Sequence, residues 1–234
     1  MKNDLIIKPP FFEIGPKSYL YGDDIIELAE IADRASIEFD VQVIFTCPFV
    51  NIQKVVERTS NLLVTAPHMD PILPGRGLAD ILPESLKAVG VSGVMLNHVE
   101  KPLRYSVLEA TIKRAKEVGL FTVVCASSIP EIQAVAHLAP DIIVAEPTEL
   151  IGTGQTSDLS YMKKSLEVIH AINPDILVLQ AAGISDGNDV FRVMEYGADA
   201  TGSSSAIANA EDKEAIVRDM ISAVRRGWES RINK

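Results

Sequence analysis

The sequence has little cysteine, little basic charge and no long apolar run, and each shortage excludes a class of protein. Only two cysteines occur among the 234 residues, Cys47 and Cys125. Each lies at the end of an apolar stretch typical of a β-strand, so we expect two buried free thiols rather than a disulfide. The apolar run within residues 1–7 is far too short for a signal peptide or a membrane span. We therefore expect a cytoplasmic protein that has no membrane partner.

The scarcity of basic residues argues against a nucleic-acid binder. Lysine and arginine number 22 against 32 aspartates and glutamates, which gives a formal net charge of -10. Binding to a phosphate backbone requires a concentrated basic face, and here the basic residues are dispersed along the chain. A small anion could still be bound, because backbone N–H groups at a loop or a helix start are sufficient for that.

What the sequence does contain is a repeated order of elements. An apolar strand-like run, a loop rich in Gly, Pro or Ser, and a segment with helical periodicity follow one another about eight times. The chain has the length of one globular domain, and we expect a single domain over residues 1–234. The predicted strands are Phe11–Ile14, Val41–Thr46, Leu62–Ala66, Gly93–Leu96, Thr122–Ala126, Ile142–Ala145, Ile176–Gln180 and Ala198–Gly202.

The segments between these strands predict the fold class. Helices are expected at Asp23–Arg34, Ser106–Val118, Ser157–Ile172, Asp186–Tyr196 and Asp212–Arg231. Alternation of strand and helix is typical of an α/β protein with a parallel sheet. Eight units in this length favour a closed (β/α)8 barrel, with an open doubly wound sheet as the alternative. In such a barrel the active site lies at the C-terminal ends of the strands.

Two titratable side chains stand at such strand ends. His98 follows the fourth strand, where an imidazole could polarise a carbonyl group, although a capping or core histidine would fit equally well. Glu146 ends the sixth strand and precedes a segment from Pro147 to Gly154 that resembles a closing loop. Such a loop would exclude water from a carboxylate base, which favours catalysis over a plain strand-end ion pair. His68, after the third strand, is interpreted as a structural or rim residue.

Small residues at the last three strand ends predict an anion site. Glycine and serine let backbone N–H groups approach a phosphate closely, although turns use the same residues. Lys17, after the first strand, could neutralise the bound anion, or it could be a surface lysine. The predicted phosphate-binding residues are Gly152, Gly183, Ser185, Ser204 and Ser205. No zinc-type spacing, P-loop or complete dinucleotide motif occurs, so we expect no metal and no cofactor.

Several of these stretches together resemble the triosephosphate isomerase family in its compact archaeal form. The resemblance covers most of the chain, and its most specific part is the run from Glu146-Pro147 to Gly152-Thr153-Gly154. Further matching stretches are His68-Met69-Asp70-Pro71, Leu82-Pro83-Glu84, Leu96-Asn97-His98 and Ala182-Gly183-Ile184-Ser185. The resemblance implies a TIM barrel, a small phosphorylated sugar as substrate, and a homodimer or homotetramer.

The resemblance also implies catalytic roles. Glu146 resembles the base that moves a proton between adjacent carbons, and His98 resembles the neutral imidazole that polarises the carbonyl, in a family that is itself a standard case of pKa tuning. Lys17 resembles the lysine that stabilises substrate and transition state. Three positions depart from the family pattern: Gly15 replaces an asparagine, Pro67 a glutamine and Val99 a serine.

The leading prediction is therefore an aldose–ketose isomerase that interconverts glyceraldehyde 3-phosphate and dihydroxyacetone phosphate through an enediol. The departures at Gly15 and Val99 leave two alternatives open. One is an isomerase of a four-carbon ketose phosphate such as erythrulose phosphate. The other is a non-catalytic phosphosugar-binding regulator. An aldolase or lyase that forms a Schiff base on Lys17 is a third and weaker alternative.

Overall fold

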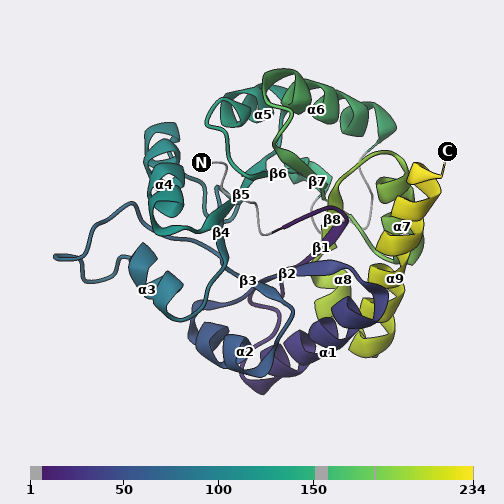
Figure 1. Cartoon of the computed structure of the whole chain (residues 1–234), viewed down its shortest axis with the longest axis horizontal. Coiled ribbons are helices and arrows are strands. Elements are labelled where there is room, and N and C mark those ends of the chain that lie inside the picture. Colours follow the sequence, from purple (N-terminus) through teal and green to yellow (C-terminus); the bar gives the residue numbers. More distant parts are fainter. Residues whose placement is uncertain (1–6, 151–157, 182, 234) are drawn as a thin grey trace.

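The computed structural model describes residues 7–150, 158–181 and 183–233, and its centre is a closed barrel of parallel strands (Figure 1). The strands pair in chain order, and β1 pairs with β8 to close the ring. The strands are β1 Phe11–Ile14, β2 Gln42–Thr46, β3 Leu63–Ala66, β4 Gly93–Leu96, β5 Phe121–Ala126, β6 Ile142–Ala145, β7 Leu177–Gln180 and β8 Ala200–Ser203. The predicted (β/α)8 barrel is confirmed, and the open-sheet alternative is wrong.

Helices follow the strands and form the outer layer of the barrel (Figure 1). They are α1 Asp23–Phe39, α2 Ile52–Arg58, α3 Pro83–Ala88, α4 Tyr105–Val118, α5 Ile129–Ala136, α6 Leu159–Ile172, α7 Gly187–Glu195, α8 Ser205–Ala208 and α9 Lys213–Ile232, with short 3-10 turns η1 Phe49–Asn51 and η2 Thr148–Leu150. Side chains of Asp158, Asp186 and Asp212 cap the first turns of α6, α7 and α9. An aspartate before each of these helices is therefore the sequence signal that marks the start of the helix.

Some predicted bounds are wrong by a few residues, for physical reasons. The helix predicted at Asp23–Arg34 continues to Phe39, because Ala35 and Ser36 remain buried and the turn comes only at Asp40, which has a φ of 50°. The last strand begins at Ala200 rather than Ala198, since Ala200 is the first residue paired with β1. Ser157, the predicted start of the sixth-unit helix, lies outside the described residues.

The barrel has two apolar cores. Side chains that point outward from the strands pack under the helices, and side chains that point inward fill the barrel itself. Gly93 on β4 is required for the inner packing, because a Cβ atom there would lie only 2.4 Å from the ring of Phe121. The inner core contains Ile7, Phe11, Ile44, Phe121, Val123, Cys125, Ile142, Val144, Leu179 and Ala200. The ring of Phe121 thus fills the space beside Gly93, which has no side chain.

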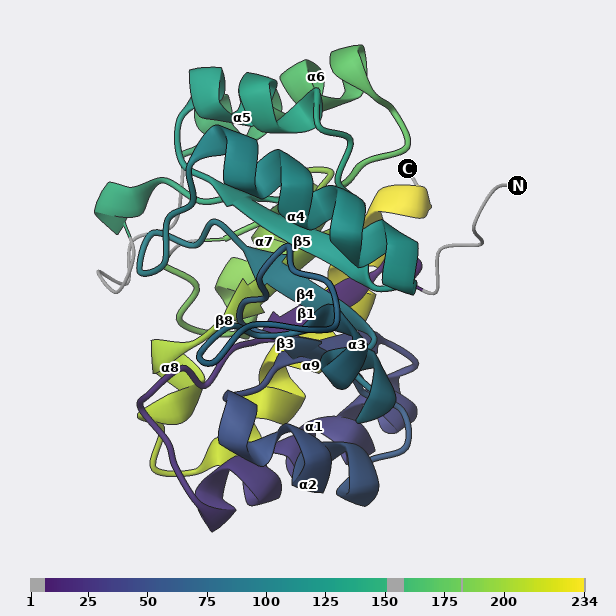
Figure 2. The same ribbon diagram turned by 90° about the vertical axis from the view of Figure 1, so that its left-hand side faces the viewer.

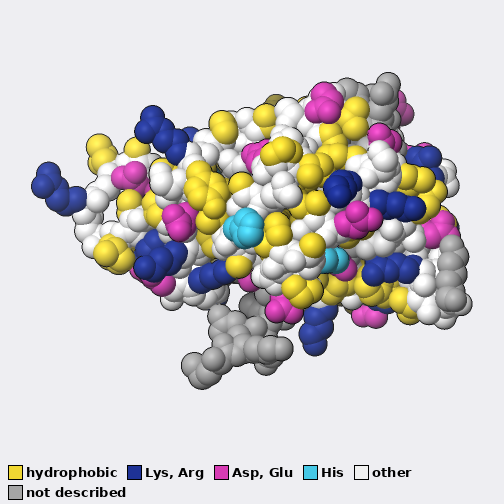
Figure 3. Space-filling view, turned by 90° about the horizontal axis from the view of Figure 1, so that it is seen from above, with side chains coloured by type: hydrophobic (Ala, Val, Ile, Leu, Met, Phe, Trp, Pro, Cys, Tyr) yellow, Lys and Arg dark blue, Asp and Glu magenta, His cyan; other side chains and the backbone are white. Residues whose placement is uncertain are grey.

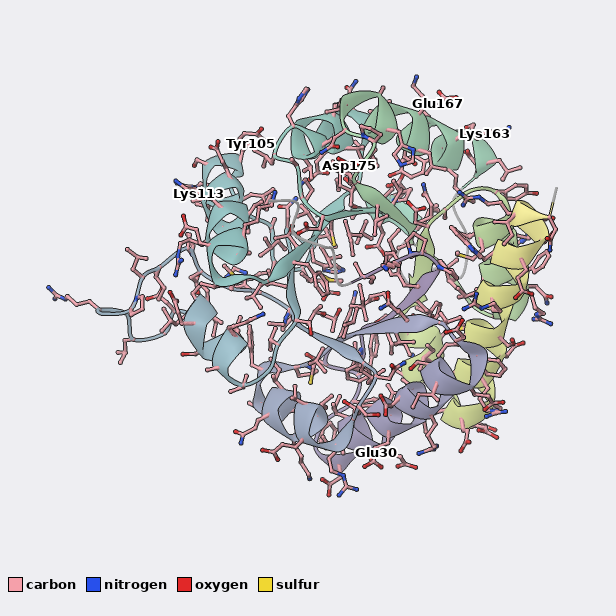
Figure 4. All side chains as sticks on the ribbon, viewed as in Figure 1. Glu30, Tyr105, Lys113, Lys163, Glu167 and Asp175 are labelled. Carbon is pink, nitrogen blue, oxygen red and sulfur yellow. The ribbon has the colours of Figure 1, made fainter. Side chains whose placement is uncertain are left out.

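The surface and the thiols agree with the composition. Both cysteines are buried and free, as predicted. Lysine and arginine are intermixed with aspartate and glutamate on the face shown in Figure 3. Glu30, Lys113 and Lys163 point away from the barrel on the outer helices (Figure 4). Within residues 7–150, 158–181 and 183–233, every helix is too short or too polar to cross a membrane.

The two ends of the barrel differ in what they carry. Figure 2 shows α8 at one end and the C-terminal turns of α9 at the other. Because all strands run in the same direction, their C-terminal ends meet at the end that carries α8. The polar residues predicted to follow the strands are therefore brought to one mouth.

Candidate active site

The three predicted catalytic residues line one cavity at this mouth. Lys17 follows β1, His98 follows β4, and Glu146 follows β6. The side chains of His98 and Glu146 are 14% and 16% exposed, and His98 Nε2 lies 3.9 Å from Glu146 Oε2. An imidazole and a carboxylate therefore lie side by side at the wall of one cavity.

His98 is held in place by Asn97, which the sequence reasoning did not single out. Asn97 has a positive φ of 57°, a conformation that asparagine tolerates better than most residues. Its Nδ2 donates to the carbonyl oxygen of Cys125 and to Glu131, at 3.0 and 3.1 Å. Its Oδ1 accepts a hydrogen bond from the Leu103 backbone N–H at 3.0 Å. The turn that delivers His98 is thus tied to β5, α5 and the following loop.

The tautomer of His98 follows from its own hydrogen bond. The backbone N–H of Glu100 donates to His98 Nδ1 at 3.2 Å. Nδ1 must then be unprotonated, so the proton of a neutral imidazole is on Nε2, which faces Glu146. Burial and the nearby charge of Lys17 lower the pKa of His98, while Glu100 opposes them. At neutral pH the site therefore holds a neutral imidazole that can donate from Nε2.

The environment of Glu146 makes its carboxylate a stronger base than a carboxylate in water. Burial is the largest cause that raises the pKa of its carboxyl group above the ordinary value. The charge of Lys17 acts in the opposite direction, and that of Glu100 adds to the increase. A carboxylate that is poorly solvated gains more by accepting a proton than one in water does. This arrangement suits proton abstraction from a carbon beside a carbonyl group.

Lys17 carries a positive charge at the wall of the site. Its Nζ lies 3.1 Å from Glu100 Oε1, and it influences the pKa values of both His98 and Glu146. The backbone of Lys17 has a φ of 48°, which is strained for a residue with a side chain. The surrounding structure must therefore stabilise this conformation. In this conformation the Lys17 side chain lies at the wall of the cavity.

Four of the predicted phosphate-binding residues line the same cavity: Gly183, Ser185, Ser204 and Ser205. Gly183 has a φ of 69°, so glycine is the residue that fits there without strain. The Ser185 backbone N–H donates to Asp189 at 3.0 Å, and Ser204 Oγ donates to the Gly15 carbonyl oxygen. The fifth predicted residue, Gly152, and the rest of the predicted closing loop after Leu150 lie outside the described residues.

The three departures from the family pattern also lie near the mouth. Gly15 and Pro67 line the cavity, whereas the Val99 side chain is 44% exposed. His68 lies at the rim, where its Nε2 pairs with Asp70 Oδ1 at 3.2 Å. Gly15 and Pro67 are thus the two departures that change the wall of the site.

The sequence reasoning did not single out two carboxylates of this site. Glu100 contacts both Lys17 and the His98 imidazole, and Glu13 on β1 lines the cavity from inside the barrel. The signal for Glu13 was its charge at an inward position of an otherwise apolar strand, Phe11–Ile14. No three His, Cys, Asp or Glu side chains gather as a metal site in the part of the chain that the structure describes.

Comparison with known proteins agrees with this geometry. A sequence model described as triosephosphate isomerase matches residues 17–221. Triosephosphate isomerase of Methanocaldococcus jannaschii is 36% identical over 203 residues, which cover 86% of this chain and 92% of that protein. Triosephosphate isomerase of Sulfolobus acidocaldarius is 34% identical over 230 residues, or 96% and 99% of the two chains. The barrel, the composition of its mouth and these relatives together show that the chain belongs to the triosephosphate isomerase family.

Proposed function

We propose that this protein is a triosephosphate isomerase, which interconverts glyceraldehyde 3-phosphate and dihydroxyacetone phosphate with Glu146 as base and His98 as electrophile. The observation that carries the proposal is the pair itself. A carboxylate with a raised pKa lies 3.9 Å from the Nε2 of an imidazole that is neutral at physiological pH. The relatives that carry the name triosephosphate isomerase support the same reaction.

In the proposed reaction a proton moves between two adjacent carbons. The Glu146 carboxylate removes a proton from the carbon next to the carbonyl, while the Nε2–H of His98 donates to the carbonyl oxygen. The resulting enediol collapses when Glu146 returns the proton to the neighbouring carbon and His98 regains a proton from the other oxygen. Lys17 opposes the negative charge that develops on these oxygens.

We assign the phosphate of the substrate to the ends of β7 and β8. Gly183, Ser185, Ser204 and Ser205 line the cavity there, and Lys17 lines the same cavity. Two loops of a (β/α)8 barrel commonly bind phosphate at this place. Gly152 and the segment around it would complete the assignment, as the sequence predicts.

The test is replacement of the base. Glu146→Ala should lower kcat by at least about a hundredfold, because a positioned general base contributes roughly 10² to 10⁴. Glu109→Ala, which removes an exposed carboxylate from α4, is the matched control and should leave turnover unchanged. Turnover of Glu146→Ala equal to that of the parent enzyme would exclude Glu146 as the base.

A second readout separates catalysis from mere binding. An active base exchanges the substrate proton with solvent, so deuterium from D₂O should enter bound dihydroxyacetone phosphate. This exchange should be lost in Glu146→Ala. Binding of the phosphosugar without any deuterium incorporation would instead indicate a non-catalytic regulator.

We also propose that the enzyme is a homo-oligomer, most simply a homodimer. The segment between β3 and α3 projects from the barrel (Figure 1), and its Leu73 and Leu78 are 66% and 104% exposed. Apolar side chains on such an arm have no core of their own to enter. Leu78→Asp should convert the oligomer to monomers in light scattering coupled to gel filtration. A parent enzyme that elutes as a monomer would contradict the proposal.

We assign the enzyme to the cytoplasm, because Cys47 and Cys125 are free thiols, which fits a reducing compartment.

A further inference from the structure

The cavity at the mouth contains a carboxyl group that the mechanism above does not use, that of Glu13 on β1. Phe11, two residues earlier, belongs to the apolar interior, and residues two apart on a strand point to the same side of a sheet. Glu13 therefore points inward, is half-buried, and lines the cavity that contains His98 and Glu146. A polar group in such a place is expected to have a partner, either in the protein or on a ligand.

Two threonines on neighbouring strands orient this carboxyl group. Thr46 Oγ1 on β2 donates to Glu13 Oε1 at 2.5 Å, and Thr65 Oγ1 on β3 donates to Thr46 Oγ1 at 3.1 Å. Among residues 7–150, 158–181 and 183–233, Thr46 is the one side-chain donor to this group, and it bonds Oε1. The second oxygen atom, Oε2, is therefore the one available to a ligand in the cavity.

The carboxyl group occupies the place in which a side chain at position 15 would begin. A Cβ atom on Gly15 would lie 3.0 Å from Glu13 Oε1, and a Cβ atom on Gly202 of β8 would lie 3.0 Å from Glu13 Oε2. The two strands that flank β1 thus present a hydroxyl group, that of Thr46, and a glycine to Glu13, and neither ionises. At the wall of the site, a carboxyl group from position 13 therefore replaces the polar side chain that the family pattern has at position 15.

The neighbouring charges place the Glu13 carboxyl group beside the proton-transfer groups. The charges of Glu146 and Lys17 both act on the pKa of Glu13, the first raising it and the second lowering it. Cys125 lines the same cavity from β5, between the strands that precede His98 and Glu146. After burial, the charges of Glu146 and Glu13 are the next causes that raise the pKa of the Cys125 thiol. The carboxyl groups of Glu13 and Glu146 therefore lie close enough across the cavity for their charges to interact.

Two carboxyl groups in one cavity do not ionise equally, because the charge of the first opposes ionisation of the second. Burial raises the pKa of Glu13 to about 7, and the charge of Glu146 adds to the increase. The Thr46 hydrogen bond and the charge of Lys17 oppose it. Glu146 must be ionised to act as the base, and its negative charge favours a proton on Glu13. Below about pH 7 Glu13 is therefore a carboxylic acid, whose O–H can donate a hydrogen bond.

A hydrogen-bond donor beside Glu146 can stabilise the charge that develops in the reaction. Formation of the enediol places negative charge on the oxygen atoms of the two reacting carbons, and donors that face these atoms stabilise it. We propose that the Glu13 carboxyl group is a further hydrogen-bond donor of this site, which binds one of these two oxygen atoms beside His98 and Lys17. The proposal rests on the isomerase function proposed above and adds one residue to it. Glu13 keeps its proton throughout the reaction, while its Oε1 stays bonded to Thr46.

The first test is the pH dependence of kcat/KM for glyceraldehyde 3-phosphate. In the parent enzyme it should fall by roughly 10- to 100-fold between about pH 6 and pH 9, because Glu13 loses its proton at about pH 7. Glu13→Gln keeps an N–H donor that does not ionise, so its kcat/KM should not show this fall. The substrate phosphate titrates equally with both enzymes, and the difference between the two profiles therefore isolates Glu13. Glu109→Ala, which removes an exposed carboxylate, should follow the parent enzyme.

A second variant should shift the pH profile instead of flattening it. Thr46→Val keeps the shape of threonine and removes a hydrogen bond that lowers the pKa of Glu13. The fall in kcat/KM should therefore move to higher pH. Thr111→Val removes the hydroxyl group of a buried threonine on α4, away from the site, and is the matched control that should leave the profile unchanged. A purely structural role of Glu13 would not produce such a shift.

The size of the contribution is measured by removing the donor. Glu13→Ala should lower kcat by about 10²- to 10³-fold, the usual cost of losing one donor to a developing oxyanion. Glu13→Ala/Gly15→Asn supplies an amide donor from position 15, beside the place that the carboxyl group occupied. It should recover at least about tenfold of the lost kcat, without a fall above about pH 7. A double variant no faster than Glu13→Ala would overturn the exchange of donors between positions 13 and 15.

The outcomes distinguish this proposal from the function on which it rests. No turnover and no deuterium exchange by the parent enzyme at any pH would overturn the isomerase function itself. A parent enzyme that is active, with the same pH profile as Glu13→Gln, would overturn the role of Glu13 alone. Should Glu13→Ala fail to fold, the profiles of Glu13→Gln and Thr46→Val decide. A flattened profile in the first and a shifted profile in the second support the proposal, and an unchanged profile in either overturns it.

Discussion

The lower interior of the barrel and its mouth are built from the same eight strands, yet they contain different kinds of side chain. The lower interior is filled by apolar side chains such as Phe11, Ile44 and Phe121. A few residues further along the strands, the mouth holds Glu13 and Glu146, both with raised pKa values. Burial stabilises the fold in the first region and opposes charge in the second. The difference shows that stability and reactivity are separated along the strand direction.

The largest expected effect on stability comes from truncating a side chain in the apolar interior of the barrel. Phe121 is 7% exposed and fills the space beside Gly93, so Phe121→Ala should lower the free energy of unfolding by about 3–5 kcal/mol. Denaturant unfolding measures this loss. Tyr105→Ala, which truncates a ring that is 50% exposed, is the control and should cost far less. Equal losses for the two variants would mean that the barrel interior is not the main stabilising core.

The second prediction concerns the stability that the protein loses with rising pH because burial opposes ionisation of the Glu13 carboxyl group at the mouth. The pKa of Glu13 is about 7 in the folded protein, above its ordinary value of 4.5. As pH rises from 4.5 to 7 the unfolded chain loses this proton while the folded protein retains it, so stability falls. Above that window the loss is complete, and it amounts to about 3 kcal/mol.

Glu13→Gln should remove this dependence. The difference in unfolding free energy between Glu13→Gln and the parent should grow by about 2–3 kcal/mol in favour of the variant between about pH 4.5 and pH 8. Denaturant titrations at the two pH values measure it. A difference that is constant with pH would show that Glu13 is as well solvated in the folded protein as in the unfolded chain.

The smallest expected effect comes from loosening the turn that positions His98. Asn97→Ala removes the side chain that ties the His98 turn to Cys125, Glu131 and Leu103. A displaced electrophile should lower kcat by about 10- to 100-fold with little change in KM. Asn188→Ala, at an exposed position of α7, is the control and should be silent. Unchanged kcat in Asn97→Ala would mean that the Glu100 backbone contact alone positions the imidazole.

How much the sequence predicts depends on the range of the interactions involved. Strands β1, β4 and β6 lie at the predicted residues, because short apolar runs between Gly, Pro and polar turns are local signals. His98, Glu146 and Lys17 could be chosen because each lies within three residues of a strand end, and they do line one cavity. The extent of α1 could not be predicted, since burial against neighbouring elements decides where that helix ends.

Glu13 and Asn97 escaped prediction for a different reason. The importance of Glu13 arises from Thr46, Gly15 and Gly202, which lie on different strands or beyond their ends. Asn97 matters through partners on β5 and α5 that are about 30 residues away in the sequence. These contacts cannot be read from the local sequence, which marks Glu13 only by its charge on an otherwise apolar strand.

By itself, therefore, the sequence determined the order of strands and helices, the net negative charge, and the strand ends at which polar side chains gather. Periodicity, capping residues and composition are local properties, and a chain carries them before it folds. Only the tertiary structure decided that the barrel closes between β1 and β8, that His98 Nε2 lies 3.9 Å from Glu146, and that Glu13 faces the site. Those facts depend on the register between strands that are distant in the sequence, and packing of the whole barrel sets that register.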